Sequence, residues 1–303
     1  MMRSALWLAC HAFAAAVTGA AMVVDLQPHA DHSIRVRVAP SGGKIVDPPV
    51  MGLLFDAPAS TTALQREGAN TLTNGNLKVV VDPATGLVTA TRVSDSKILL
   101  QQTVLAFTAP TNHATSTPLE GTKPNSVATA ASFKSSPTEK IYGLGEHRTG
   151  TLGRKPYSKI FVESQLYGKS HGSDASIPWY ASSEGYGFLW NLPSYGSINI
   201  TDDSIDWTSD SSLNFDIWIT TTNDTTTAGS QYAELMHHYV DAVGHASRMP
   251  FYSTGFIQCK DRYRNQSQLL DVARGYVARS LPISVIVIVS AAHPFCYTWR
   301  IGQ

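Results

Sequence analysis

Charged side chains are scarce in this chain. They make up 15% of its 303 residues, against about 25% in typical soluble proteins, and 23 Lys and Arg balance 23 Asp and Glu. A neutral chain excludes a nucleic-acid binder that works through bulk positive charge. Only 7 residues are Glu, whereas 31 are Ser and 28 are Thr, a composition that favours strands and turns over long helices. We therefore expect a mainly β protein, long enough for about two domains.

Cysteine is also scarce. The three cysteines, Cys10, Cys259 and Cys296, are too few for a scaffold built on disulfides. Zinc-type Cys and His spacing is missing, and His237 and His238 are neighbours on an expected helix, where adjacent side chains diverge. We interpret these two histidines as helix surface and rim, and we expect neither a metal nor a cofactor.

Long apolar runs are missing beyond the N-terminus, so no membrane partner is expected. Met1-Met2-Arg3 is a short basic segment, Ala5 to Val17 is mostly apolar, and Thr18-Gly19-Ala20 offers small residues for cleavage. This pattern predicts a secretory signal peptide over residues 1–21 and a secreted protein, with a buried first helix or an anchor as the alternative. Glycosylation sequons at Asn199, Asn223 and Asn265 are compatible with secretion.

Short strands and turns follow the N-terminus. Residues 34–38 alternate apolar and basic side chains, which predicts a strand with one wet face. Residues 76–81, 87–93 and 97–107 have strand character, and Asp82 to Gly86 has the composition of a tight turn. The same rhythm returns between Tyr186 and Thr220. Residues 22–226 are therefore expected to form a two-sheet β-sandwich.

The pattern then changes to helical. An apolar face at i, i+3, i+4 and i+7 predicts a linking helix within residues 227–249. Tyr252 to Cys259 is a plausible strand, Asn265 with Gln268 is a capping-box-like start of a helix, and Ile283 to Val289 is an apolar run typical of a strand buried on both faces. Residues 250–289 thus predict one βαβ unit of a parallel sheet.

Three clusters could carry chemistry. Residues 142–147 hold two glycines, which either allow a tight backbone path or shape a substrate pocket. Residues 167–174 are polar and lead to Trp179 and Tyr180, a set that suits a sugar, although we favour these two rings as core aromatics over stacking platforms. Residues 258–264 follow the first parallel strand, where active-site loops lie in α/β sheets; the alternative is a solvated loop with one buried thiol.

Taken together, these segments resemble glycoside hydrolase family 31, the α-glucosidase and α-xylosidase family, over about residues 33–288. The resemblance is carried by four segments in the family's order: Tyr142-Gly-Leu-Gly-Glu-His147; Ile177-Pro-Trp-Tyr180 with Gly185-Tyr-Gly-Phe-Leu-Trp-Asn191; Gly255-Phe-Ile-Gln-Cys-Lys260 with Arg262-Tyr-Arg264; and Leu281-Pro-Ile-Ser-Val-Ile-Val-Ile288. Residues 147–152 are more similar to the α-xylosidase branch than to the starch-type glucosidases.

The resemblance implies a galactose-mutarotase-like β-sandwich packed on a (β/α)8 barrel. It further implies retaining hydrolysis of α-linked oligosaccharides or glycosides, with an aspartate nucleophile and a second carboxyl as acid and then base. In the family the sandwich contributes a loop over the first sugar subsite, for which His171, Ser173 and Asp174 are the candidates here. The family's usual Asn-x-Asp just upstream is replaced by residues 163–165, Glu-Ser-Gln.

The second barrel strand is followed by a departure from the family. Resemblance ceases after Ile288, and residues 290–303 form a divergent tail. A complete barrel takes about 250 residues, so residues 250–289 are expected to be the first βαβ unit of a truncated barrel, with Cys259, Lys260 and Arg262 as further substrate-binding candidates and both catalytic carboxylates outside the chain. We expect an inactive N-terminal fragment of a secreted α-glycosidase, with no catalytic residue of its own. The alternatives are a non-catalytic carbohydrate-binding sandwich, or partner of the full-length enzyme, and a sugar epimerase.

Overall fold

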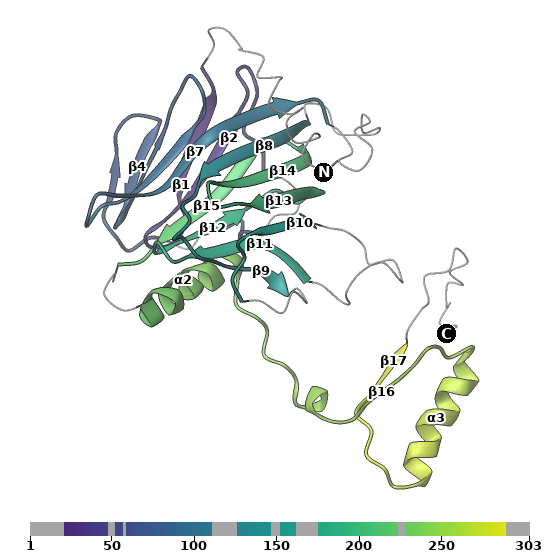
Figure 1. Ribbon diagram of the computed structural model, residues 1–303. Coiled ribbons are helices and arrows are strands. Elements are labelled where there is room, and N and C mark those ends of the chain that lie inside the picture. The colour runs from purple at the N-terminus through teal and green to yellow at the C-terminus, as the bar shows by residue number, and fades with distance from the viewer. Residues whose placement is uncertain are drawn as a thin grey trace. The chain divides into compact units, whose positions relative to one another are not determined.

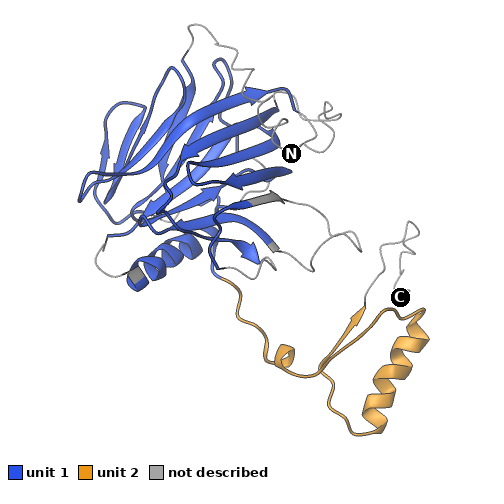
Figure 2. Cartoon of the chain, viewed as in Figure 1, with its two compact units in different colours: residues 1–245 blue, residues 246–303 orange. Residues whose placement is uncertain are grey.

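The computed structural model describes residues 21–47, 52–56, 59–110, 126–146, 152–161, 175–223 and 228–288. Figure 2 shows its two compact units, residues 1–245 and 246–303. None of the helices in these ranges is long and apolar enough to cross a membrane. The expected signal peptide lies almost wholly outside the described residues.

The described strands of the first unit form two antiparallel sheets (Figure 1). The six-stranded sheet has the spatial order β1 (Val23–Pro28), β2 (Ser33–Ala39), β15 (Phe215–Thr221), β12 (Tyr186–Trp190), β11 (Ala175–Ser182) and β9 (Ile141–Glu146). The nine-stranded sheet has the order β10 (Tyr157–Phe161), β13 (Gly196–Ile200), β14 (Ser204–Ser212), β8 (Val127–Lys134), β7 (Lys97–Thr108), β6 (Val88–Arg92), β5 (Leu77–Val81), β4 (Thr71–Asn74) and β3 (Leu64–Arg66). The prediction of a mainly β chain is confirmed.

The core lies between the two sheets. Ile34, Val36 and Val38 point inward from β2 and are fully buried, as the alternation in the sequence predicts. Trp190 of β12 stacks on Trp207 of β14, with ring centroids 5.4 Å apart, so an aromatic pair joins the two sheets directly. Each fully buried large apolar side chain contributes about 1.5–3 kcal/mol, which makes this core the main source of stability.

The opposite face of β2 is not wet, and that part of the prediction is wrong. Arg35 and Arg37 are 4% and 6% exposed. The Arg35 guanidinium donates to Asp216 of β15 at 2.6 and 3.1 Å and to Asp47 at 2.9 Å, while Arg37 donates to Asp47 at 2.7 Å and to Asp25 of β1 at 3.0 Å. Paired carboxylates let these cations be buried, and sequence alternation alone does not reveal such partners.

A helix packs on the six-stranded sheet. It is α2 (Ala228–Val243), whose Leu235 and Ala242 are buried against a second apolar cluster. The Trp179 ring of β11 lies 4.6 Å from the ring of Tyr239 on α2. The helix ends at Gly244, whose φ of 97° is the left-handed conformation that glycine adopts without strain. The helix predicted within residues 227–249 is thus present, and it packs on the sandwich.

The second unit contains a 3-10 turn η1 (Phe251–Thr254), β16 (Ile257–Lys260), α3 (Gln266–Ala278) and β17 (Val285–Ile288). Strands β16 and β17 pair in parallel, as predicted. The helix start is also confirmed, because the Asn265 side chain accepts a hydrogen bond from the Gln268 amide.

Two details of this unit differ from the prediction. The strand begins only at Ile257, because the Ser253 hydroxyl and amide both donate to the Pro250 carbonyl and close a turn instead. Strand β17 is not buried on both faces: Ile288 is 62% exposed and Val287 is 38% exposed. An apolar run shows that a strand can be buried, but burial also needs a layer of structure on each face. No described element of this unit covers the second face of β17.

Candidate functional site

The carboxyl-terminal edge of β16 and β17 carries three of the predicted site residues. Lys260 pairs with Ile288, so both parallel strands end at the same edge. Cys259 and Lys260 lie inside β16 and Arg262 follows it, and all three side chains are exposed. No ion pair joins either cation to a carboxylate among the described residues. Their charges therefore face solvent, available to an anionic or hydroxyl-bearing ligand.

The thiol at this edge corrects one interpretation. The alternative interpretation of residues 258–264 as a solvated loop with one buried thiol is wrong about the thiol, because Cys259 is a free and exposed cysteine. Side chains alternate along a strand, and here the inward position belongs to Gln258. The Tyr276 hydroxyl of α3 donates to Gln258 Oε1 at 2.6 Å, and the Tyr276 ring lies 5.5 Å from that of Phe256. These contacts fix α3 against β16.

Three other predicted site residues, His171, Ser173 and Asp174, lie outside the described residues, so their roles remain predictions. The segment that holds them joins β10 of the nine-stranded sheet to β11 of the six-stranded sheet. The two aromatics that follow are core residues: Trp179 is 6% exposed and Tyr180 is fully buried. The interpretation of these rings as core aromatics is confirmed.

The glycine-bearing segment 142–147 forms most of β9. Gly143 has a φ of 120°, and a Cβ placed on it would lie 2.8 Å from the Trp179 carbonyl oxygen. The tight backbone path is therefore real, because strands β9 and β11 approach more closely than a side chain permits. Glu146 is exposed at the end of β9, and His147 lies outside the described residues.

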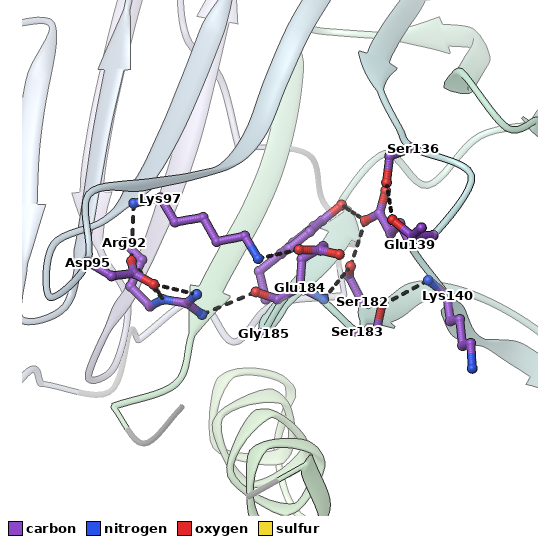
Figure 3. A network of polar contacts seen from close by, with 12 residues as sticks. Arg92, Asp95, Lys97, Ser136, Glu139, Lys140, Ser182, Ser183, Glu184 and Gly185 are labelled. Atoms are coloured by element: carbon purple, nitrogen blue, oxygen red, sulfur yellow. Dashed lines mark hydrogen bonds and ion pairs between the residues drawn. The ribbon is translucent and has the colours of Figure 1, made fainter. Parts of the chain in front are cut away.

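A network of polar contacts runs along one end of the sandwich (Figure 3). Within it, Glu139 accepts hydrogen bonds from the hydroxyls of Ser135, Ser182 and Tyr186, at 2.7, 2.6 and 2.9 Å. Burial raises the pKa of Tyr186 well above its ordinary value. A carboxylate beside tyrosines resembles an acid/base pair, but Glu139 is 5% exposed and Tyr186 is fully buried, which leaves no route for a substrate. We interpret the network as structural.

A cavity of about 470 Å³ lies beside α2, and sequence reasoning missed it. Asp241 on its lining lies 2.9 Å from His237 Nδ1 through Oδ2, as an ion pair when that imidazole is protonated, and its Oδ1 accepts a hydrogen bond from His245 Nε2 at 2.8 Å. His238, also on the lining, contacts the Thr220 hydroxyl through Nδ1 at 2.8 Å, and burial lowers its pKa. His237 is exposed and His238 is half-buried, which fits the interpretation of the pair as helix surface and rim. The signal in the sequence was the spacing of four residues between His237, Asp241 and His245.

No group of three His, Cys, Asp or Glu side chains is placed to hold a metal ion in the part of the chain that the structure describes. The imidazoles of His238 and His245 on the lining make hydrogen bonds. The described site residues thus fall into two regions, the edge of the βαβ unit and the cavity on the sandwich, and each region belongs to a different unit.

The fold is similar to that of solved xylosidase structures. The chain matches a family 31 α-xylosidase from a soil metagenome, complexed with xylose, with a TM-score of 0.61 and 28% identity over 90% of this chain and 41% of that one. It matches a xylosidase from Aspergillus niger with a TM-score of 0.62 and 23% identity over 88% of this chain and 37% of that one, which shows a shared fold. The fold therefore defines the class of the first unit as a two-sheet antiparallel β-sandwich that these xylosidases share.

The sequence comparisons narrow that class. The family described as the glycosyl hydrolase 31 N-terminal galactose mutarotase-like domain matches residues 23–199. The chain therefore belongs to glycoside hydrolase family 31. It is 36% identical to an uncharacterized family 31 glucosidase of Pseudescherichia vulneris over 55% of this chain, and 27% identical to α-xylosidase A of Aspergillus niger over 87%. The matches span 29% and 36% of those two relatives' lengths.

Proposed function

We propose that this chain is the N-terminal portion of a retaining α-glycosidase that acts on α-linked xylosides or glucosides. The observation that carries the proposal is the family match over residues 23–199, which spans most of the sandwich. Two relatives named α-xylosidase, from Saccharolobus solfataricus and Aspergillus niger, and the xylose complex of the metagenomic enzyme favour a xyloside.

The βαβ unit would supply the first part of a (β/α)8 barrel. Active sites of such barrels lie at the carboxyl ends of the strands, where Lys260 is the last residue of β16 and Arg262 follows it. In this role the two cations and the Cys259 thiol would contact sugar hydroxyls through exposed groups. His171, Ser173 and Asp174 would come from the sandwich and close over the first subsite.

Hydrolysis with retention needs two carboxyl groups about 5–5.5 Å apart, one as nucleophile and one as acid and then base. We propose that neither lies in these 303 residues, and that the chain by itself turns over no substrate. The extent of the matches supports this, because the chain corresponds to 36% of the Aspergillus niger α-xylosidase and a barrel takes about 250 residues. Secretion through a signal peptide over residues 1–21 is a further part of the proposal.

A paired assay tests this function. Two proteins are purified: the 303-residue chain, and an extended product in which the frame or exon that continues the barrel after the codon for Ile288 replaces residues 289–303. Both are incubated with aryl α-xylosides and α-glucosides. The extended product should release the aryl alcohol, and the 303-residue chain should release none. Turnover by the 303-residue chain that is lost on substitution of one of its own carboxylates would contradict the assignment of catalysis elsewhere. An extended product without activity on either substrate would contradict the glycosidase function.

A further inference from the structure

The chain holds three Asn-x-Ser/Thr sequons, at Asn199, Asn223 and Asn265, and the structure places them in three different environments. We propose that Asn223 and Asn265 are acceptors of N-linked glycans and that Asn199 is not. The inference rests on the secretory route in the proposed function and is independent of catalysis.

The chemistry of the modification decides what an acceptor needs. The amide nitrogen Nδ2 forms a bond to the anomeric carbon of a lipid-linked oligosaccharyl diphosphate. The bond between that carbon and the diphosphate oxygen breaks, the lipid diphosphate leaves with the bonding electrons, and Nδ2 loses one of its two hydrogens as a proton. The carbonyl oxygen Oδ1 is unchanged. An acceptor in a folded protein therefore needs open space at Nδ2, while hydrogen bonds accepted by Oδ1 are compatible with the glycan.

Asn223 has this open space. It lies two residues beyond the end of β15, and its side chain is exposed. Its backbone N–H donates to Glu234 Oε1 of α2 at 2.7 Å, so the main chain is held, while its side chain makes no hydrogen bond to a described residue. A glycan on Nδ2 would extend into solvent without displacing a contact of the described structure.

Asn265 has the same property for a different reason. It caps α3 through Oδ1, which accepts from the Gln268 amide at 2.9 Å. This bond uses the atom that glycosylation leaves unchanged, so the cap and the glycan can coexist. Asn265, Gln266 and Ser267 are all exposed, which gives access to the whole sequon.

Asn199 lacks the open space. It sits in the middle of β13, paired with Ser158 of β10 on one side and Asp206 of β14 on the other. Its Nδ2 is directed at Asp206 Oδ2, at 3.5 Å, and Asp206 is 4% exposed. Asn199 itself is only partly exposed, and a sugar on Nδ2 would have to displace this contact beside a buried carboxylate on an inner strand of the sheet. The neighbours Ile198 and Ile200 are core residues that fix the strand in this position.

Site-resolved mass spectrometry tests the proposal. The full chain is secreted from a eukaryotic host behind a heterologous signal sequence, and its peptides are treated with peptide-N-glycosidase, which converts each modified Asn to Asp. Conversion is expected at Asn223 and Asn265 and not at Asn199. Thr225→Ala should abolish the first and Ser267→Ala the second, whereas Thr225→Ser preserves the sequon and should keep the first glycan.

An unmodified Asn223 or Asn265, or a modified Asn199 in secreted protein, would overturn the assignment. A second version of the protein, secreted only if its native residues 1–21 act as the signal sequence, separates this result from the proposed function. Glycans behind the heterologous signal but none behind the native segment would refute secretion and leave the acceptor assignment in place. The readout is mass, so an inactive chain gives the same result as an active one.

Discussion

Removal of the Asp216 carboxylate probes the buried ion pair that holds β2 against β15. Asp216 is fully buried, Arg35 is 4% exposed, and the guanidinium donates to both carboxylate oxygens, at 2.6 and 3.1 Å. After Asp216→Leu, Arg35 keeps its ion pair with Asp47, whose side chain is 50% exposed and therefore compensates the buried charge less well. Loss of one partner from a buried pair costs about 3–5 kcal/mol when the other charge is left without compensation, so the remaining contact with Asp47 places the expected cost near the lower end of that range.

The double variant Arg35→Met with Asp216→Leu removes both charges and should recover much of that loss. It does not recover all of it, because Asn191 Nδ2 also donates to Asp216, at 3.0 Å, and is left without this acceptor. An unsatisfied buried donor costs about 1–3 kcal/mol, and this sets the remaining deficit. The double variant is therefore expected to be more stable than the single one.

The assay is urea unfolding followed by the emission of the buried tryptophans of the first unit. A matched control is Lys97→Met, which breaks the ion pair with Glu184, where the two side chains are 42% and 29% exposed. Exposed pairs contribute about 0–1 kcal/mol, so this variant should unfold close to the wild type. An Asp216→Leu variant as stable as the control, or a double variant less stable than the single one, would refute the reasoning.

Three further predictions concern pH, backbone and thiol. Burial lowers the pKa of His29 and His238 below their ordinary value of 6.5, so stability that is complete above pH 6.5 should fall as the pH drops toward their folded-state values; His238→Gln should flatten this dependence in unfolding curves taken at a series of pH values. Gly143→Ala should lower the free energy of unfolding in urea by about 1–3 kcal/mol, because the new Cβ would lie 2.8 Å from a backbone oxygen and the φ of 120° is strained for alanine. Gly153→Ala, with nothing within 4 Å of the new Cβ, should be near neutral. Cys259 should react with a thiol reagent in native protein, seen by peptide mapping; labelling only after denaturation would contradict its exposure.

Local signals predicted the elements of this fold well. The turn at Asp82 forms because its Oδ1 accepts from the amides of Ala84 and Thr85, at 2.9 and 2.8 Å, and Gly86 takes a φ of 74°. The start of α3 follows from the cap at Asn265. Both features depend on residues within four positions of one another, which is the range that sequence patterns report.

Long-range contacts account for what the sequence did not reveal. Arg35 can be buried because it pairs with Asp216, and this partner lies 181 positions later in the chain. His238 likewise forms its hydrogen bond with Thr220 of β15, outside its own helix. The exposure of Ile288 likewise depends on which layers cover β17, and an apolar run does not specify them. The edge with Lys260 and Arg262 could be predicted from strand order, whereas the cavity around Asp241 required the packing of α2.

The most direct measurement of the central claim is the anomeric configuration of the first sugar released by the product of the reading frame extended beyond Ile288. Proton nuclear magnetic resonance during hydrolysis of an aryl α-xyloside or α-glucoside resolves the α and β anomers before they equilibrate. Retention through two displacements predicts that the α anomer appears first. First appearance of the β anomer, or no hydrolysis of either substrate, would contradict the assignment of this chain to a retaining α-glycosidase.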